Sequence, residues 1–287
     1  MTVDLAEEVR TLLHDAKYQA SRRILEPVSL LSPVPAVSSL ELAALVLAAF
    51  FAGAVDAIGG GGGLIMVPAL LAVGLPPHLA LGTNKGQSLF GSLAAAVRYA
   101  RAGLVDWRAA RVTFPLAFLG ALAGAALVSV IRPEVLRPVV LGLLVLAAVL
   151  VTVARPRAEA RSAPVRGAWV AGIAALAVGT YDGFFGPGAG TFYIAGFVGL
   201  LGLPLARASA DAKVANFASN VAAAVLFASR GAIVWSIALP LAAGQLLGGF
   251  LGAHIAVRRG DRVIRAVVLL VVLALVIKVA RDLALGR

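Results

Sequence analysis

The stretch Ile58-Gly59-Gly60-Gly61-Gly62-Gly63-Leu64-Ile65-Met66-Val67-Pro68 decides how this chain folds. Five consecutive glycines follow a long apolar run and precede a short apolar piece that extends to Val73. A glycine in a helix interior costs roughly 1 kcal/mol relative to alanine. The run therefore predicts a break in a segment that is otherwise apolar and helical.

A second glycine-rich stretch, Gly186-Pro187-Gly188-Ala189-Gly190, lies 127 residues further on and also precedes a short apolar piece, from Thr191 to Leu201. Other landmarks recur at an offset of 128: Gly74-Leu75-Pro76 and Gly202-Leu203-Pro204, Lys85 and Lys213, Gly103 and Gly231, Trp107 and Trp235, Gly120 and Gly248, Gly124 and Gly252. The chain therefore consists of two similar halves, each interrupted by glycine. This pattern is typical of a membrane transporter whose site lies where the halves meet.

The composition sets the class of protein. Hydrophobic residues make up 61% of the chain and charged residues 14%, and the mean hydropathy is +0.96. Apolar runs cover residues 41–58, 79–97, 112–131, 138–154, 168–181, 191–203, 214–229, 232–257 and 266–280. Several reach or approach the roughly 20 residues that cross a ~30 Å hydrocarbon core as a helix. We expect an all-α, polytopic protein of the cell (inner) membrane, in contact with the lipid bilayer.

The net charge of +11 does not indicate a nucleic-acid-binding protein. The arginines lie in short connections between apolar runs, where such charge fixes membrane orientation, and no basic stripe with interleaved aromatics is present. The chain has no cysteine, and its three histidines, His14, His78 and His254, are too scattered for a metal site. We expect no metal and no cofactor.

The chain divides into four parts. Residues 1–38 have apolar positions at helical spacing and predict an amphipathic segment on the bilayer surface. Residues 41–154 and 167–285 are the two membrane repeats, joined by a polar linker at 155–166. Each repeat is expected to hold about five membrane segments, including a half-helix after the glycine break, because ten residues of helix rise only about 15 Å.

Loop charge predicts that the repeats are inverted. The loop at 98–111 has four arginines, whereas its counterpart around Arg230 has one. The loop at 132–137 has two arginines, and its counterpart at 258–265 has four. Parallel repeats would place equivalent loops on the same side with similar charge. The opposite bias places the loops at 98–111, 155–166 and 258–265 in the cytoplasm and both termini outside.

The two glycine breaks are candidates for an anion site. Unwound backbone at membrane depth is tolerated when it is buried in protein or lines a cavity, and its free amides at the start of a half-helix attract an anion. The alternative is close helix packing through small residues. The candidate residues are Gly60, Gly61, Gly62 and Gly63 in the first break and Gly186, Gly188, Ala189 and Gly190 in the second.

Two lysines are the second part of the predicted site. The chain has four lysines, and Lys85 and Lys213 occupy equivalent positions inside expected helices. An ammonium inside a membrane indicates function unless it snorkels to the interface, which is the alternative. Asn84 lies beside Lys85, while Ser88 and Asn216 each follow a lysine by three residues and share its helix face.

Three aspartates inside the spans, Asp56, Asp182 and Asp211, are candidates for proton coupling. Asp56 and Asp182 end the spans that precede the glycine breaks, so each could carry a proton, pair with a lysine of the site, or face water at the membrane surface. Five aromatic residues surround the second break and predict an aromatic wall: Tyr181, Phe184, Phe185, Phe192 and Tyr193.

Neither glycine stretch completes a nucleotide-binding motif. The first lacks the Lys-Ser or Lys-Thr of a P-loop, and no alternation of strands and helices surrounds either stretch. No activated nucleophile with a base stands out within the apolar segments. The chain is therefore not expected to be an enzyme.

The first break and the residues after it resemble the sulfite exporter TauE/SafE family. The resemblance lies in the segment from Ile58 to Leu71, then Gly74-Leu75-Pro76, then Ala80-Leu81-Gly82-Thr83-Asn84. The second copy, from Gly183 to Lys213, resembles that family's degenerate repeat, with Pro187 and Ala189 in place of glycines. The resemblance covers residues 41–285 and implies a bacterial inner-membrane permease for sulfite, organosulfonates or related small anions.

The sequence thus predicts a secondary transporter of a small sulfur-containing or carboxylate anion. The anion would bind between the repeats through the glycine amides and lysines, and a proton would be the coupling partner if transport is coupled. The alternatives are a permease for a metal cation or neutral molecule and a membrane subunit that does not transport. Substrate, direction, coupling ion and oligomeric state stay open.

Overall fold

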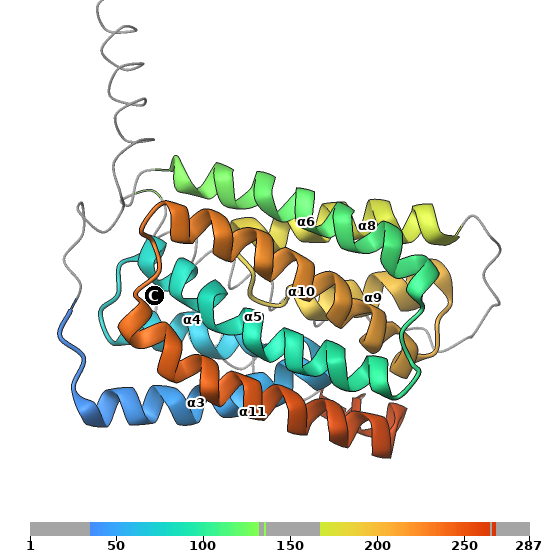
Figure 1. The fold of residues 1–287 in the computed structure, drawn as a ribbon, viewed down its shortest axis with the longest axis horizontal. Helices are drawn as coiled ribbons and strands as arrows, with labels where there is room; N and C mark the ends of the chain where they lie inside the picture. Colours follow the sequence, from blue (N-terminus) through green and yellow to red (C-terminus); the bar gives the residue numbers. More distant parts are fainter. Residues whose placement is uncertain (1–34, 132–134, 136–166, 265, 268–287) are drawn as a thin grey trace, which may run out of the picture.

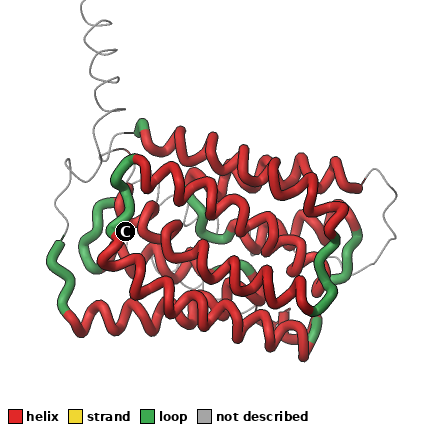
Figure 2. The backbone as a smooth tube through the Cα atoms, in the orientation of Figure 1, coloured by secondary structure: helices red, strands yellow, loops and turns green. Residues whose placement is uncertain are grey.

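The computed structural model describes residues 35–131, 135, 167–264 and 266–267. Every regular element among these residues is a helix (Figure 2). The helices pack side by side in an elongated bundle (Figure 1). The all-α fold class is confirmed for this part of the chain.

The first half contributes four helices: α3 (Ser39–Gly59), α4 (Gly62–Ala72), α5 (Pro77–Arg101) and α6 (Trp107–Ser129). Ser38 starts α3 with a capping box to Glu41. Gly60 ends α3 in the left-handed conformation, with φ 85°, which favours glycine. Asp106 caps α6 by accepting hydrogen bonds from the Arg108 and Ala109 amides.

The second half repeats this order with α8 (Gly167–Phe184), α9 (Ala189–Leu201), α10 (Leu205–Ser229) and α11 (Trp235–Arg259). The predicted breaks are confirmed, since helical structure stops between α3 and α4 and again between α8 and α9. The helices that follow are short, with 11 residues in α4 and 13 in α9. At 1.5 Å per residue each rises about 16–20 Å, less than a full membrane crossing.

The central helices α5 and α10 run in opposite directions. Near the start of α5, the Thr83 hydroxyl accepts a hydrogen bond from the amide of Val234, just beyond the end of α10. Near the start of α10, the Asp211 carboxylate accepts one from the amide of Asp106, just beyond the end of α5. Figure 1 shows the two helices side by side in the middle of the bundle.

Two outer pairs each join a helix of one half to a helix of the other, and glycines make the contacts. Along α6 and α8, Gly172 lies against Val112, and Gly183 against Ala121 further along. Along α3 and α11, Gly244 lies against Val46, and Gly252 lies against Ala54 further along. Both pairs are therefore parallel, and the absence of side chains at the glycines lets the backbones approach closely.

The bundle has an apolar exterior. Exposed large hydrophobic residues lie on the outer helices, among them Leu47 and Phe51 on α3, Leu119 and Leu127 on α6, Ile173 on α8 and Leu247 on α11. Four helices, α3, α6, α10 and α11, are long and apolar enough to cross a membrane. Helices α5 and α8 are not among them; α5 carries many polar side chains, which it buries in the centre of the bundle.

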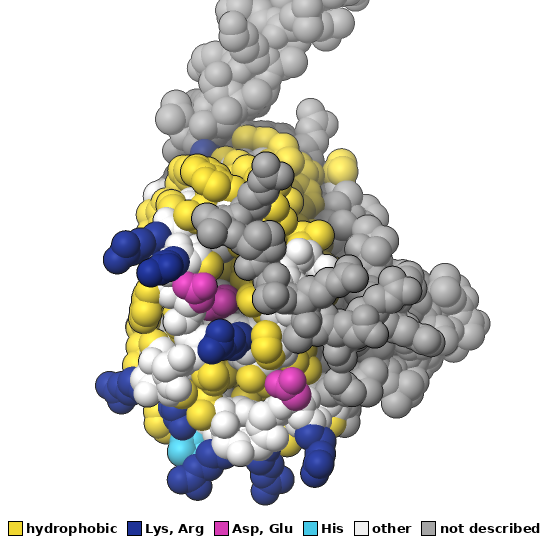
Figure 3. Space-filling model, turned by 90° about the vertical axis from the view of Figure 1, so that its right-hand side faces the viewer, with side chains coloured by type: hydrophobic (Ala, Val, Ile, Leu, Met, Phe, Trp, Pro, Cys, Tyr) yellow, Lys and Arg dark blue, Asp and Glu magenta, His cyan; other side chains and the backbone are white. Residues whose placement is uncertain are grey.

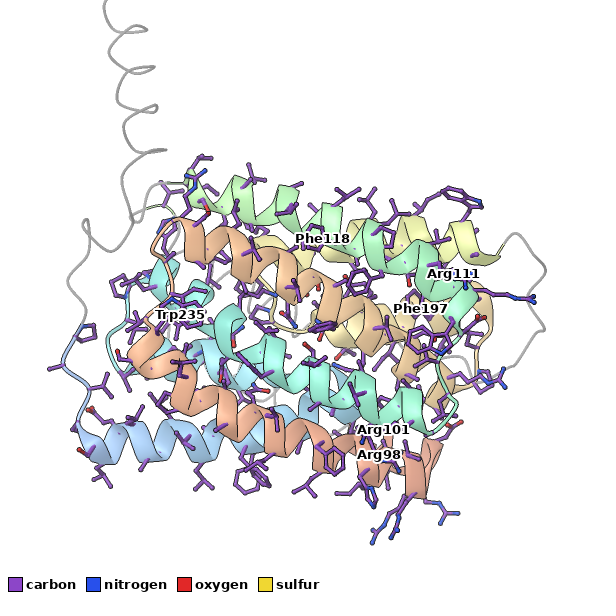
Figure 4. All side chains as sticks on the ribbon, viewed as in Figure 1. Arg98, Arg101, Arg111, Phe118, Phe197 and Trp235 are labelled. Carbon is purple, nitrogen blue, oxygen red and sulfur yellow. The ribbon has the colours of Figure 1, made fainter. Side chains whose placement is uncertain are left out.

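Positive charge gathers at one end of the bundle. Exposed arginines there come from the end of α5, the start of α6, and the end of α11 with the residues just after it: Arg101, Arg108, Arg111, Arg258, Arg259 and Arg262. Figure 3 looks onto this end and shows the dark blue side chains around its edge. In Figure 4, Trp235 lies at the opposite end from Arg98, Arg101 and Arg111.

Some predicted segments lie outside the described residues. These are most of the amphipathic segment at 1–38, the apolar run at 138–154, the linker at 155–166 and most of the run at 266–280. The four remaining membrane segments expected of each repeat are all present as helices.

Candidate functional site

The two glycine breaks cross each other in the middle of the bundle. A side chain on Gly60 would collide with the backbone of Gly190 and Thr191, and one on Gly63 would lie 3.1 Å from the Cα of Pro187. The Thr191 hydroxyl donates a 2.7 Å hydrogen bond to the carbonyl of Gly59. The crossing therefore needs glycine for backbone approach, as the close-packing alternative required.

The same crossing leaves backbone amides free. Helices α4 and α9 both begin here, and among the described residues nothing accepts a hydrogen bond from the amides of Gly63 and Gly190. The Gly62 amide donates weakly, at 3.3 Å, to the Asp56 carboxylate. Helix N-termini carry partial positive charge. The glycine breaks therefore allow close helix packing and also present an electropositive backbone at the same place.

Lys85 reaches the crossing from α5. Its Nζ donates a 2.5 Å hydrogen bond to Asp182 Oδ1 on α8 and a 3.1 Å bond to Asn220 Oδ1 on α10. A side chain on Gly186 would lie 2.9 Å from this nitrogen, so the ammonium lies directly against the second break.

Lys213 reaches the crossing from α10. Its Nζ donates a 2.8 Å hydrogen bond to Asp56 Oδ2 on α3 and a longer one, 3.4 Å, to Asn216 Oδ1. A side chain on Gly190 would lie 3.1 Å from this nitrogen. Each lysine thus pairs with the aspartate of the other half, and the two ion pairs are reciprocal.

Both lysines are interior residues. Lys85 is 2% exposed and Lys213 is fully buried. The snorkelling alternative is therefore wrong, because neither ammonium reaches the surface. The pairing alternative for Asp56 and Asp182 is what the geometry shows, and Asp182, at 1% exposed, does not face water.

The aspartates differ in their surroundings. Asp182 Oδ2 accepts a 3.0 Å hydrogen bond from Asn216 Nδ2 and a second bond from the Ser219 hydroxyl. Asp211 lies away from the crossing and binds the amide of Asp106 in the loop between α5 and α6. Of the three predicted proton carriers, the structure therefore brings two to the lysines.

The predicted polar residues Asn84 and Ser88 form a small network near the first break. Asn84 Oδ1 accepts hydrogen bonds from Gln87 Nε2 at 3.2 Å and from the Ser88 hydroxyl at 3.5 Å. Neither residue bonds to a lysine. The Gly63 position lies near the Asn84 amide nitrogen, with 3.7 Å to an added side chain.

Ser92, Ser219 and Asn220 were not among the predicted site residues, but the structure brings them to the site. Asn220 Nδ2 donates a 3.3 Å hydrogen bond to Ser92 Oγ. These two residues are equivalent under the 128-residue offset, so equivalent positions of the two halves touch each other here. Helical spacing in the sequence could have identified both residues, because Asn220 follows Lys213 by seven residues and Ser92 follows Lys85 by seven.

The expected aromatic wall is present at the second break. Tyr181 makes edge-on contacts with Phe185 and Phe192, and its hydroxyl donates a 2.6 Å hydrogen bond to the carbonyl of Pro187. Tyr193 is almost fully buried beside Phe197. These rings surround the second break with apolar side chains.

Comparisons with known proteins extend over most of the chain. A family model described as Sulfite exporter TauE/SafE matches residues 45–279. The probable membrane transporter protein YfcA of Escherichia coli K12 is 38% identical over 236 residues, which cover 82% of this chain and 88% of that protein. The probable membrane transporter protein ORF9 of a Sinorhizobium species is also 38% identical, over 84% of this chain and 93% of its own. A probable membrane transporter protein of Haemophilus influenzae is 37% identical, over 84% and 95% respectively. No solved structure gave a significant match.

Proposed function

Because the chain belongs to the sulfite exporter TauE/SafE family of membrane transporters, we propose that it moves a small anion, such as sulfite, an organosulfonate or a carboxylate. The family membership makes the chain a multi-pass membrane transporter rather than an enzyme. The anion itself, and the site that binds it, are what the proposal adds.

One observation carries the proposal: two buried ammonium groups lie against crossed helix N-termini at the centre of the bundle. Lys85 lies against Gly186 and Lys213 lies against Gly190, while Asn84 lies near Gly63. Ammonium groups, side-chain amides and free backbone amides are donors that suit a small oxyanion. The residues proposed to contact it are the glycines of both breaks, Ala189, Asn84, Lys85, Ser88, Lys213 and Asn216.

The charges of the site balance before an anion enters. Lys85 with Asp182, and Lys213 with Asp56, form two ion pairs with no net charge. In a buried site an uncompensated charge costs several kcal/mol. The anion must therefore displace an aspartate from a lysine, so binding requires the ion pairs to rearrange.

We propose that residues 41–154 and 167–285 are inverted repeats related by an axis near Ser92 and Asn220. The antiparallel course of α5 and α10 supports this relation, as do the reciprocal ion pairs. In such transporters the substrate binds near the bilayer midplane where the repeats meet. The position of the crossed breaks in the middle of the bundle supports such a site.

The test is transport by purified protein in liposomes. Exchange of labelled sulfite, methanesulfonate and acetate should exceed that of protein-free liposomes for at least one of the three. Lys85→Met and Lys213→Met should weaken exchange, since each removes a charge-assisted contact worth about 1.5–3 kcal/mol. Movement of metal cations or neutral solutes without any of the three anions would contradict the proposal.

A further inference from the structure

We propose that Asp56 is the carboxylate that takes up a proton when the anion binds, and that Asp182 keeps its charge throughout. This inference rests on the proposed function and adds the coupling ion and its acceptor. It follows from a difference between the two ion pairs, which occupy equivalent places but are not equally held.

Asp182 is fixed by several donors. Its two oxygens together accept hydrogen bonds from Lys85, Asn216 and Ser219. Its side chain is 2% exposed. A carboxylate that accepts three side-chain hydrogen bonds is stabilised in its charged form. A proton reaching Asp182 would have to break this network.

Asp56 accepts fewer hydrogen bonds than Asp182 and is partly exposed. Its oxygens accept one bond from Lys213 and one long bond, 3.3 Å, from the Gly62 amide. Its side chain is 17% exposed, against 0% for Lys213. A proton can therefore reach Asp56, and protonation breaks only one strong interaction.

The sequence explains why Asp182 has more hydrogen-bond donors than Asp56. In α10 the residues three and six positions after the lysine are Asn216 and Ser219, and both donate to Asp182. The equivalent residues in α5 are Ser88 and Gly91. Ser88 donates to Asn84 instead, and Gly91 has no side chain to donate. Asp56 therefore lacks both donors in this structure, and position 91 has no side chain that could supply one.

Other titratable residues lie on the helices packed against α3, including Tyr193 on α9 and Asp211 on α10. Tyr99 on α5 is near enough to interact electrostatically with Asp56, and its hydroxyl donates to the carbonyl of Ala57 at 2.9 Å. On α11, His254 accepts a 3.2 Å hydrogen bond from Arg98. Helix α4 contains no titratable residue. Lys213 is thus the positively charged partner of Asp56, and protonation of Asp56 would release it to bind the anion.

The proton balance of the step is simple. One proton adds to the Asp56 carboxylate and makes a neutral carboxylic acid, which releases the Lys213 ammonium. That ammonium then binds one monovalent anion, and the site returns to zero net charge. When both leave on the other side, the Asp56–Lys213 pair forms again. One proton and one monoanion move together, so transport is electroneutral.

The experiment compares wild type, Asp56→Asn and Asp211→Asn in liposomes with sulfite, methanesulfonate and acetate. Two assays are run at identical pH values, so that protonation of sulfite itself cancels between variants: exchange at equal pH, and accumulation driven by a pH gradient. Asp56→Asn mimics the protonated state. It should still catalyse exchange, at a rate that differs from wild type because Lys213 has lost its carboxylate partner. Accumulation driven by the gradient should fall to the level of protein-free liposomes, and exchange should become sensitive to membrane potential.

Asp211→Asn is the matched control, because that residue lies away from the lysines and asparagine keeps the oxygen that binds the Asp106 amide. It should keep both exchange and accumulation. Asp56→Glu, which retains a titratable carboxylate, should keep accumulation with a shifted pH dependence, and it serves if Asp56→Asn does not fold.

The outcomes separate the two proposals. If wild type exchanges none of the three anions, the proposed function is wrong. If wild type exchanges an anion but a pH gradient does not drive it, or if Asp56→Asn still accumulates it, only the role of Asp56 is wrong. Loss of exchange in folded Asp56→Asn, or an unshifted pH dependence in Asp56→Glu, would also overturn that role.

Discussion

Among the individual residues, Lys213 is the most enclosed charge of the site. It is fully buried and donates to Asp56 and Asn216. Replacing it by methionine leaves Asp56 without its cation. Removing one partner of a buried pair costs about 3–5 kcal/mol, so Lys213→Met should lower the unfolding temperature measured in detergent.

The double variant Asp56→Asn/Lys213→Met provides the control for this prediction. With both charges removed, no buried ion lacks a partner, and most of the lost stability should return. If the double variant were no more stable than Lys213→Met alone, the two residues would not be coupled energetically.

Among the elements, the crossed breaks place the tightest demand on the backbone. Gly60 has φ 85°, and a side chain there would meet Gly190 and Thr191. Gly60→Ala should therefore destabilise the protein by more than about 1 kcal/mol, the scale at which alanine is disfavoured at positive φ. Thermal unfolding and exchange should both be impaired.

Gly196 on α9 offers the comparison. Apart from its own helix backbone, no atom of the described residues lies within 4 Å of the position where its side chain would begin, and the residue is inside a helix. Gly196→Ala should therefore be neutral or stabilising by up to about 1 kcal/mol from helix propensity. Equal damage from both substitutions would mean that the crossing is not specially constrained.

For the whole molecule, the orientation of the halves gives a sharp labelling prediction. Arg101 and Ser229 are equivalent residues, the last of α5 and of α10, and both are exposed. Since the chain has no cysteine, Arg101→Cys and Ser229→Cys would each carry the only thiol. An impermeant maleimide applied to whole cells should label Ser229→Cys and should label Arg101→Cys only after permeabilisation.

Labelling of both variants from one side would favour parallel repeats. The arginines around Arg101 set the expected side, because positively charged loops remain in the cytoplasm. Thr2→Cys, in the N-terminal segment expected outside, provides a positive control for external labelling.

Much of the fold could be predicted from the sequence, because its signals were local and were repeated. Five glycines in a row predict a break without knowledge of any contact, and the 128-residue offset pairs Lys85 with Lys213. The partners of these lysines could not be predicted. Asp182 is 97 residues from Lys85 along the chain, and Asp56 is 157 from Lys213. Only the packing of α5 and α10 between the outer helices decides which carboxylate meets which ammonium.

The candidate site was predicted in part for the same reason. Spacing along a helix placed Ser88 and Asn216 beside their lysines, but it could not show that only Asn216 turns to an aspartate. Nor could it remove Asp211, whose sequence neighbours resemble those of a site residue. Its actual partner, the Asp106 amide, lies in a loop of the other half.

Helices α6 and α11 each pack mainly against the opposite half of the chain, and this affects which parts of the bundle could move together. Helix α6 packs against α8 and α10 and hardly touches α5, to which a short loop joins it, while α11 packs against α3 and α5. If two parts of the bundle move against each other during transport, this packing favours parts that differ from the two repeats. One body contains α3, α4 and α5 of the first half together with α11 of the second. The other contains α8, α9 and α10 of the second half together with α6 of the first.

Cross-linking would reveal these bodies. A short bismaleimide between Arg98→Cys and His254→Cys joins α5 to α11, whose side chains touch there, and it should leave transport intact although it ties the two repeats together. A disulfide between Ser92→Cys and Asn220→Cys, on α5 and α10, should stop transport. Both ion pairs join the two bodies, so they oppose movement of one body against the other until the Asp56–Lys213 pair opens.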